Sequence, residues 1–179
     1  MGANLKEVRD RIKSVISTQQ ITKAMKMVSA AKFRKAQQAI TQIRPYADRL
    51  NRMMKNIAAN TDGGSTLVYN QERDVKKVML VVVTSSRGLC GAFNTNVVKA
   101  AVASIEGKYS QVYKDGNLSI LCIGKKGFDG LKRRYPKAHF NTESVDLFMN
   151  LAFENVASVS GKIMGLFAGK EYDEVAVAY

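Results

Sequence analysis

Cysteine, histidine and proline are scarce in this sequence of 179 residues, and tryptophan is absent. The two cysteines, Cys90 and Cys122, both stand in apolar segments, so we predict two buried thiols in a reducing compartment and no disulfide framework. The single histidine, His139, leaves no zinc ligand set. The sequence therefore predicts neither a metal site nor a cofactor.

Long apolar runs are also missing. The longest ones, such as residues 78–83, fall far short of the roughly 20 residues that a membrane-spanning helix needs. The first residues lack the apolar core of a secretory signal, and their acidic side chains argue against an organelle transit peptide. We therefore expect no transmembrane span and a mature cytoplasmic N-terminus.

Negative charge is the next deficit, with 15 Asp and Glu against 28 Lys and Arg and a net charge of +13. Such an excess is compatible with nucleic acid, an anionic membrane surface or an acidic protein as the partner. The basic side chains gather in two clusters, one in the first third of the chain and one in the second half. They are Lys23, Lys26, Lys32, Arg34 and Lys35, and then Lys125, Lys126, Lys132, Arg133, Arg134 and Lys137.

Glycine is absent between Asn4 and Asn60, and Pro45 is the one proline there. This composition predicts a single helix of roughly 80 Å, several times the width of a small domain. An internal proline costs a helix about 3 kcal/mol and one backbone hydrogen bond. Because the apolar pattern resumes in register after Pro45, we expect a kink in the helix and no break.

Apolar residues recur along this helix at alternating steps of three and four, which is the pattern of a coiled-coil seam. The seam residues are Leu5, Val8, Ile12, Val15, Phe33, Ala36, Ile40, Ile43, Ala47, Leu50, Met54 and Ile57. In the gap between Val15 and Phe33 the same register falls on four polar residues, Gln19, Thr22, Lys26 and Ser29. A self-associating coiled coil is the simpler interpretation, but this polar gap argues against a plain dimer.

A second apolar row accompanies the polar gap, at Ile21, Ala24, Met25, Val28 and Ala31. Methionine-rich surfaces suit contacts that change or slide. We therefore predict a partner-contact surface made of Gln19, Thr22, Lys23, Met25, Lys26 and Ser29.

The periodicity changes after a connector at residues 61–74, whose first six residues, TDGGST, are typical of turns. Continuous β-branched runs at 77–84 and 118–124 predict buried parallel strands, with a third strand at 174–179 and a short edge strand starting at Phe140. Helices are expected at 95–105, 125–135 and 147–167. The fold class is therefore α/β, with a long N-terminal helix at 1–60 and a three-layer Rossmann-like domain with a mostly parallel sheet at 75–179. A chain that stops on a strand suggests a fragment.

A glycine-bearing loop follows the first strand, at the edge where doubly wound sheets place ligands. Its residues are Arg87, Gly88, Leu89, Cys90, Gly91 and Asn94. The spacing of the two glycines matches neither a dinucleotide fingerprint nor a P-loop, so we expect a tight turn with Asn94 or Thr95 capping the next helix, and Cys90 buried as a small apolar residue. Glu143 and Asp146 are expected to cap the helix at 147–167.

Two strings carry a resemblance to a known family. The opening ANLKEVRDRIKSVISTQQITKAMKMVSAAKFRKAQ with the later RPYA, and the separate TSSRGLCGAFN, resemble the gamma subunits of bacterial F-type ATP synthases in order and spacing. Ser86 stands where that family usually has aspartate. The family's C-terminal helix, which pairs antiparallel with the N-terminal one, has no counterpart in this sequence.

The resemblance implies a non-catalytic rotor shaft of the F1 sector, peripheral at the cytoplasmic face of the bacterial inner membrane. The implied partners are the α and β subunits, the ε subunit and the membrane c-ring, with no nucleic acid. An isolated chain is then expected to self-associate through its unpaired helix. Two alternatives stay open on the residues alone, a nucleic-acid-binding coiled-coil adaptor that uses the cluster at 125–137 and a Rossmann-type enzyme that uses the Gly88 loop.

Overall fold

The computed structural model describes residues 4–60, 68–70 and 73–179. The chain divides into two compact units, Met1–Gly64 and Ser65–Tyr179, and each is described here by itself. The turn-rich start of the predicted connector, residues 61–66, lies outside the described residues. No helix in the described ranges is long and apolar enough to cross a membrane.

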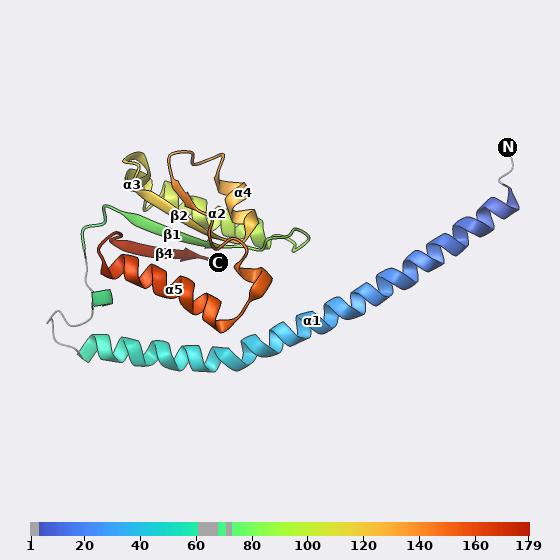
Figure 1. Ribbon diagram of the computed structural model, residues 1–179, viewed down its shortest axis with the longest axis horizontal. Helices are drawn as coiled ribbons and strands as arrows, with labels where there is room; N and C mark the ends of the chain where they lie inside the picture. Colours follow the sequence, from blue (N-terminus) through green and yellow to red (C-terminus); the bar gives the residue numbers. More distant parts are fainter. Residues whose placement is uncertain (1–3, 61–67, 71–72) are drawn as a thin grey trace. The chain divides into compact units, whose positions relative to one another are not determined.

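The first unit contains one helix, α1 (Leu5–Asn60), as the unbroken run of helix-forming residues predicts. Asn4 accepts a hydrogen bond from the Lys6 backbone N–H through its Oδ1 at 3.2 Å, and Glu7 places negative charge in the first turn. The helix continues through Pro45, as predicted. Figure 1 shows that the axis of α1 changes direction within its cyan part.

The second unit is built on a four-stranded sheet with the order β3-β2-β1-β4. All neighbouring strands run parallel, in agreement with the predicted sheet. The strands are β1 (Val78–Val83), β2 (Leu118–Ile123), β3 (His139–Asn141) and β4 (Glu174–Ala178). The strand order reverses beside β1, because β2 and β3 follow on one side of it and β4 returns to the other.

Helices cover both faces of this sheet and make three layers (Figure 1). On one face α2 (Phe93–Glu106), α3 (Ser110–Lys114) and α4 (Lys125–Leu131) enclose the larger core, which includes Leu80, Ile105 and Ile120. On the other face α5 (Phe153–Ala168) packs over Met79, Val81 and Leu121. The fold class predicted from the sequence, α/β with a Rossmann-like domain, is confirmed.

Thr84 and Gly124 join the carboxyl ends of β1 and β2. The buried Thr84 hydroxyl donates to the Gly124 carbonyl at 3.1 Å and accepts from the Gly127 backbone N–H at 2.7 Å. Gly124 has a φ of +93°, and a Cβ placed there would lie 1.9 Å from the Thr84 carbonyl oxygen. Only glycine fits this close approach of two strand ends.

Several predicted helix boundaries are wrong. The helix expected at 147–167 is interrupted after the 3₁₀ helix η2 (Leu147–Asn150), because Ala152 is extended and α5 begins only at Phe153. Asp146 stands at the N-cap of η2 without a side-chain capping bond, and Glu143 pairs with Lys162. Helix α4 ends at Leu131, earlier than predicted, and α3 was not predicted.

The segment that leads into β1 is tied to the turn between α5 and β4. Arg73 donates through Nη1 to the Phe167 carbonyl at 3.0 Å, and its guanidinium lies 4.6 Å from the centre of the Phe167 ring. Asp173 accepts the backbone N–H groups of Lys76 at 3.0 Å and Lys77 at 2.8 Å. These hydrogen bonds hold the pKa of the Asp173 carboxyl below its ordinary value, the bond from Lys77 most of all.

Candidate partner-binding site

The apolar seam of α1 lies in the open. Every described side chain of the helix is exposed, and the seam residues Leu5 and Phe33 expose 75% and 70% of their surface. The other large apolar seam residues are exposed as well, namely Val8, Ile12, Val15, Ile40, Ile43, Leu50, Met54 and Ile57. A contiguous exposed apolar stripe of this length marks a surface that a partner covers.

The polar gap in the seam has its own chemistry. Thr22 donates its hydroxyl to the carbonyls of Thr18 and Gln19, each at 3.0 Å, so its proton is used within the helix. The remaining predicted contact residues, Gln19, Lys23, Met25, Lys26 and Ser29, are all exposed. The gap therefore offers amides, hydroxyls and ammonium groups where the flanking turns offer aliphatic side chains.

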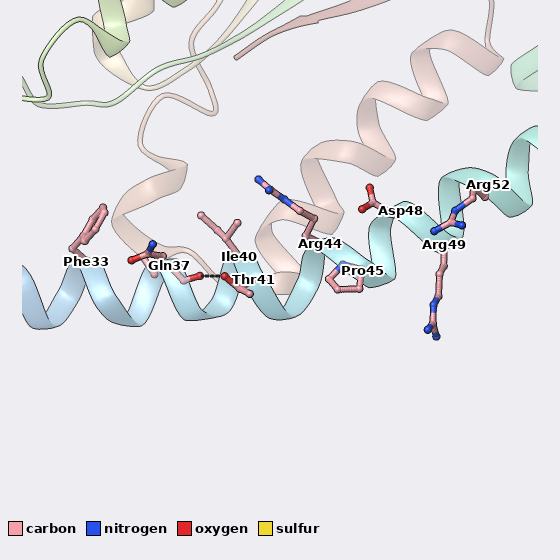
Figure 2. A pocket seen from close by; sticks show the side chains of 10 residues that line it. Phe33, Gln37, Ile40, Thr41, Arg44, Pro45, Asp48, Arg49 and Arg52 are labelled. Atoms are coloured by element: carbon pink, nitrogen blue, oxygen red, sulfur yellow. Dashed lines mark hydrogen bonds between the residues drawn. The ribbon is translucent and has the colours of Figure 1, made fainter.

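A hollow of about 720 Å³ lies along the helix around Pro45. Its lining combines apolar seam residues with three arginines of the following turns, and Figure 2 shows Arg44 and Arg49 extending in opposite directions from the helix. Within the helix, the Thr41 hydroxyl donates to the Gln37 carbonyl at 2.9 Å. The lining residues are Phe33, Ala36, Gln37, Ile40, Thr41, Arg44, Pro45, Asp48, Arg49 and Arg52.

The polar part of this hollow was not predicted from the sequence. Its signal is present in the sequence, because Arg44, Asp48, Arg49 and Arg52 follow one another at helical spacing beside the seam. A mixed apolar and basic surface of this kind suits a partner that brings both an apolar edge and acidic groups.

The glycine-bearing loop after β1 forms a second exposed feature at the point where the strand order reverses. Asn94 fixes the loop: its Oδ1 accepts the Ser85 backbone N–H at 3.0 Å, and its Nδ2 donates to Ser85 Oγ at 2.9 Å and Cys90 Sγ at 3.1 Å. Leu89 at the tip has a φ of 64° and is fully exposed. The hydrogen bonds of Asn94 therefore fix the loop as a turn, with the apolar side chain of Leu89 at its tip.

Two predictions about this loop are wrong. Cys90 is exposed, because the turn carries it outside the core, whereas Cys122 is buried as predicted. Burial raises the pKa of the Cys122 thiol to about 11. Neither Asn94 nor Thr95 caps the next helix, since α2 begins at Phe93 without a side-chain capping bond and Asn94 bonds back to the loop.

The basic cluster at 125–137 is partly compensated by carboxylates of its own domain. Arg134 pairs with Glu106 at 2.7 Å, and Lys126 lies 4.0 Å from Asp129. Tyr135 also donates to Glu106 at 3.1 Å. Burial, and to a smaller extent this hydrogen bond, raises the pKa of the Tyr135 hydroxyl. This surface therefore carries less free positive charge than its sequence indicates.

The fold and these surfaces define a Rossmann-like α/β protein that carries a long, exposed amphipathic helix. The model of the family described as ATP synthase matches residues 4–179. The ATP synthase gamma chain of Cytophaga hutchinsonii is 52% identical over 176 residues, which cover 98% of this chain and 59% of the relative. The chain belongs to the ATP synthase gamma-chain family.

Other relatives agree. The ATP synthase gamma chain of Christiangramia forsetii is 45% identical over 177 residues, covering 99% of this chain and 59% of that protein. The one of Chlorobium limicola is 41% identical over 175 residues, covering 98% and 60%. The chain thus spans about three fifths of the length of the curated relatives it matches.

Proposed function

We propose that the chain acts as the gamma subunit of the F1 sector of an F-type ATP synthase, as the central rotor shaft. In this role it couples ion flow through the membrane sector to ATP synthesis or hydrolysis at the α/β ring. The observation that carries the proposal is the 56-residue helix α1, whose apolar seam is exposed and interrupted by polar residues. Membership of the gamma-chain family supports it.

The two parts of the seam have different roles in this proposal. Between Phe33 and Ile57 the regular apolar residues pair with a second, antiparallel helix and make the shaft stiff. Around Lys23, Met25 and Lys26 the shaft meets the catalytic ring. Exposed charge pairs are worth at most about 1 kcal/mol each and are screened by salt, so such contacts break at every rotational step.

The chain performs no bond chemistry in this role, because ATP is made and hydrolysed on the α/β ring while the shaft carries torque. The α/β domain meets the ε subunit and the c-ring, and the protein is peripheral at the cytoplasmic face of the bacterial inner membrane. The Rossmann-like sheet is then a rigid mount for these contacts. Support comes from the dense core on both sheet faces.

Nucleic-acid binding is not favoured as a function. In the cluster at 125–137, Arg134 and Lys126 pair with carboxylates of their own domain. Membership of the ATP synthase family also favours a role in a rotary complex. Binding to a phosphate backbone depends on unpaired Lys and Arg side chains, which displace the counterions condensed on the nucleic acid.

The proposal is tested by assembly. A tagged chain, expressed with the α and β subunits of the same organism, should retain both through affinity purification and gel filtration. The matched control carries Ile40→Asp and Ile43→Asp, which put charge into the exposed seam without touching the α/β core. A folded chain that retains neither subunit would contradict the proposal.

The isolated chain provides a second test. An unpaired seam should recruit the seam of another copy, so sedimentation should show a concentration-dependent oligomer. The Ile40→Asp and Ile43→Asp chain should sediment as a monomer. A wild-type monomer with a fully folded α1 would argue against the exposed seam as a helix-pairing surface.

A further inference from the structure

A cavity of about 310 Å³ lies between α5 and the sheet, where residues of β1, β2 and β3 line it. It is distinct from the long helix and from the loop after β1. Its floor is formed by Met79 and Leu121, which are almost completely buried. Its helical wall comes from α5, namely Val159, Ile163, Gly165 and Leu166.

The mouth of the cavity is polar and electrically balanced. Glu143 and Lys162 form an ion pair at 3.6 Å beside it, and both side chains are largely exposed. Asn141 also lies there, and its Oδ1 accepts the Glu143 backbone N–H at 3.0 Å. The Nδ2 group of the same amide can then donate to a ligand. Ser144 adds a hydroxyl.

Gly165 is an exposed residue of α5 at the edge of the cavity. A Cβ built there meets no heavy atom within 4 Å, so this position has open space for a larger side chain. An apolar cavity of about 150 Å³ holds a benzene molecule, and ligand cavities begin at about 300 Å³. The space under α5 therefore fits one or two fused rings.

We propose that this cavity binds a small, neutral, mainly aromatic or alicyclic molecule with one hydrogen-bonding group. The apolar floor and wall take the ring, because burial of apolar surface drives binding. Asn141 and Ser144 meet the hydrogen-bonding group at the mouth. A neutral ligand is selected because the rim charges of Glu143 and Lys162 already cancel, so that an added charge would lose hydration without gaining a free counter-charge.

The experiment measures binding of 2-naphthol to the whole chain, with 2-naphthoate as the charged probe of the same shape. Gly165→Leu adds a large side chain at the edge of the cavity. Gly161→Leu is the matched control, since it makes the same change on α5, also meets no heavy atom within 4 Å, and lies outside the cavity lining. We expect Gly165→Leu to raise the Kd for 2-naphthol by about tenfold or more and Gly161→Leu to leave it unchanged.

A second measurement keeps the test decisive if Gly165→Leu fails to fold. Methyl NMR of the wild-type chain should show shifts at Leu121, Val159 and Ile163 when 2-naphthol is added. Glu143→Gln, which frees the Lys162 ammonium, should bring the affinity for 2-naphthoate up to that for 2-naphthol.

Four results would overturn the proposal. Equal affinities of the two leucine variants, or shifts confined to α1 methyl groups, would mean that the probe binds elsewhere. Wild-type binding of 2-naphthoate as tight as that of 2-naphthol would refute the neutral ligand class. Loss of 2-naphthol binding on assembly with the α, β and ε subunits would mean that the cavity is a protein contact.

Discussion

The helix α1 and the α/β domain use similar apolar residues in opposite ways. Ile120 in β2 has 0% of its surface exposed, and Ile40 in α1 has 55% exposed. The domain buries its apolar residues on both faces of one sheet, whereas α1 presents them outward along its described length. The apolar residues of the domain therefore stabilise its own fold, whereas those of α1 form an exposed surface that suits a partner.

This difference sets what holds each part together. Burial of apolar surface contributes about 25 cal/mol per Å², and the domain gains it within its own core. A helix without tertiary packing depends on helix propensity and length, which are marginal sources of stability. We therefore expect substitutions in the domain to change the free energy of unfolding, and substitutions in α1 to change association.

The largest effect is expected for Gly124→Ala. Its Cβ would lie 1.9 Å from the Thr84 carbonyl oxygen, and the φ of +93° is strained for any other residue. We expect a loss of more than about 4 kcal/mol in the free energy of unfolding, measured by urea titration. Gly88→Ala, which meets open space, is the control and should cost little. Equal stability of the two variants would refute the close approach of the strand ends.

The paired substitutions Ile120→Ala and Ile40→Ala test the comparison directly. Removal of the buried side chain should cost about 2–5 kcal/mol of domain stability, because it leaves a cavity. The exposed change should alter domain stability by less than about 0.5 kcal/mol and weaken self-association in sedimentation. A similar stability loss in both would show that α1 is packed within the same cooperative unit.

A smaller effect is expected for Asp173→Asn. Two backbone N–H groups favour the charged form and lower the carboxyl pKa from its ordinary value of 3.8. Stability from this group is therefore fully present above the unfolded pKa and is lost as the pH falls through the folded pKa. The wild-type advantage should be less than about 1 kcal/mol at pH 7, since the group is partly exposed. It should vanish as the pH falls through the folded pKa, which lies below 3.8.

Urea titrations between pH 2.5 and 7 measure this difference, at about half-unit steps. Asp146→Asn is the matched control, because Asp146 makes no side-chain capping bond. A wild-type advantage that grew as the pH fell would contradict the assigned direction of the Asp173 shift.

The smallest change in stability, with the largest functional consequence, is expected for Lys23→Glu combined with Lys26→Glu. Both side chains are exposed, so unfolding of the α/β domain should shift by less than about 0.5 kcal/mol. Coupling of ion flow to ATP synthesis, measured with membrane vesicles that contain the assembled complex, should fall. Lys6→Glu with Lys13→Glu makes the same charge change on exposed residues of α1, outside the predicted contact surface and outside the hollow around Pro45. Intact coupling in the first double variant would remove that surface assignment.

Regular apolar patterns made most of the fold predictable from the sequence. The seam of α1 and the β-branched runs of β1 and β2 each repeat over several residues, so the helix and strands were placed within a few residues. Features decided by single hydrogen bonds were missed. The amide of Asn155 donates to the Asn150 carbonyl at 2.9 Å across the interruption before α5, and nothing in the apolar spacing of that segment indicates it.

The same limit applies to the candidate sites. The exposed seam and its polar gap were predicted, because they depend on periodicity. The hydrogen bond between Asn94 and Ser85 was not predicted. An asparagine near the start of a helix can cap that helix or bond back to the preceding loop, and the sequence does not distinguish the two. The cavity beside Gly165 was invisible as well, because it results from the position of α5 over the sheet.

The order of the strands also affects how the protein is made. During synthesis β1 leaves the ribosome early and can pair with β2 soon afterwards, but its other edge stays open until β4 has been translated. At about 5–20 residues per second, this interval lasts several seconds. An apolar strand with an open edge invites pairing with other nascent chains. Until β4 is translated, the second edge of β1 therefore stays open to such pairing, and β4 closes it.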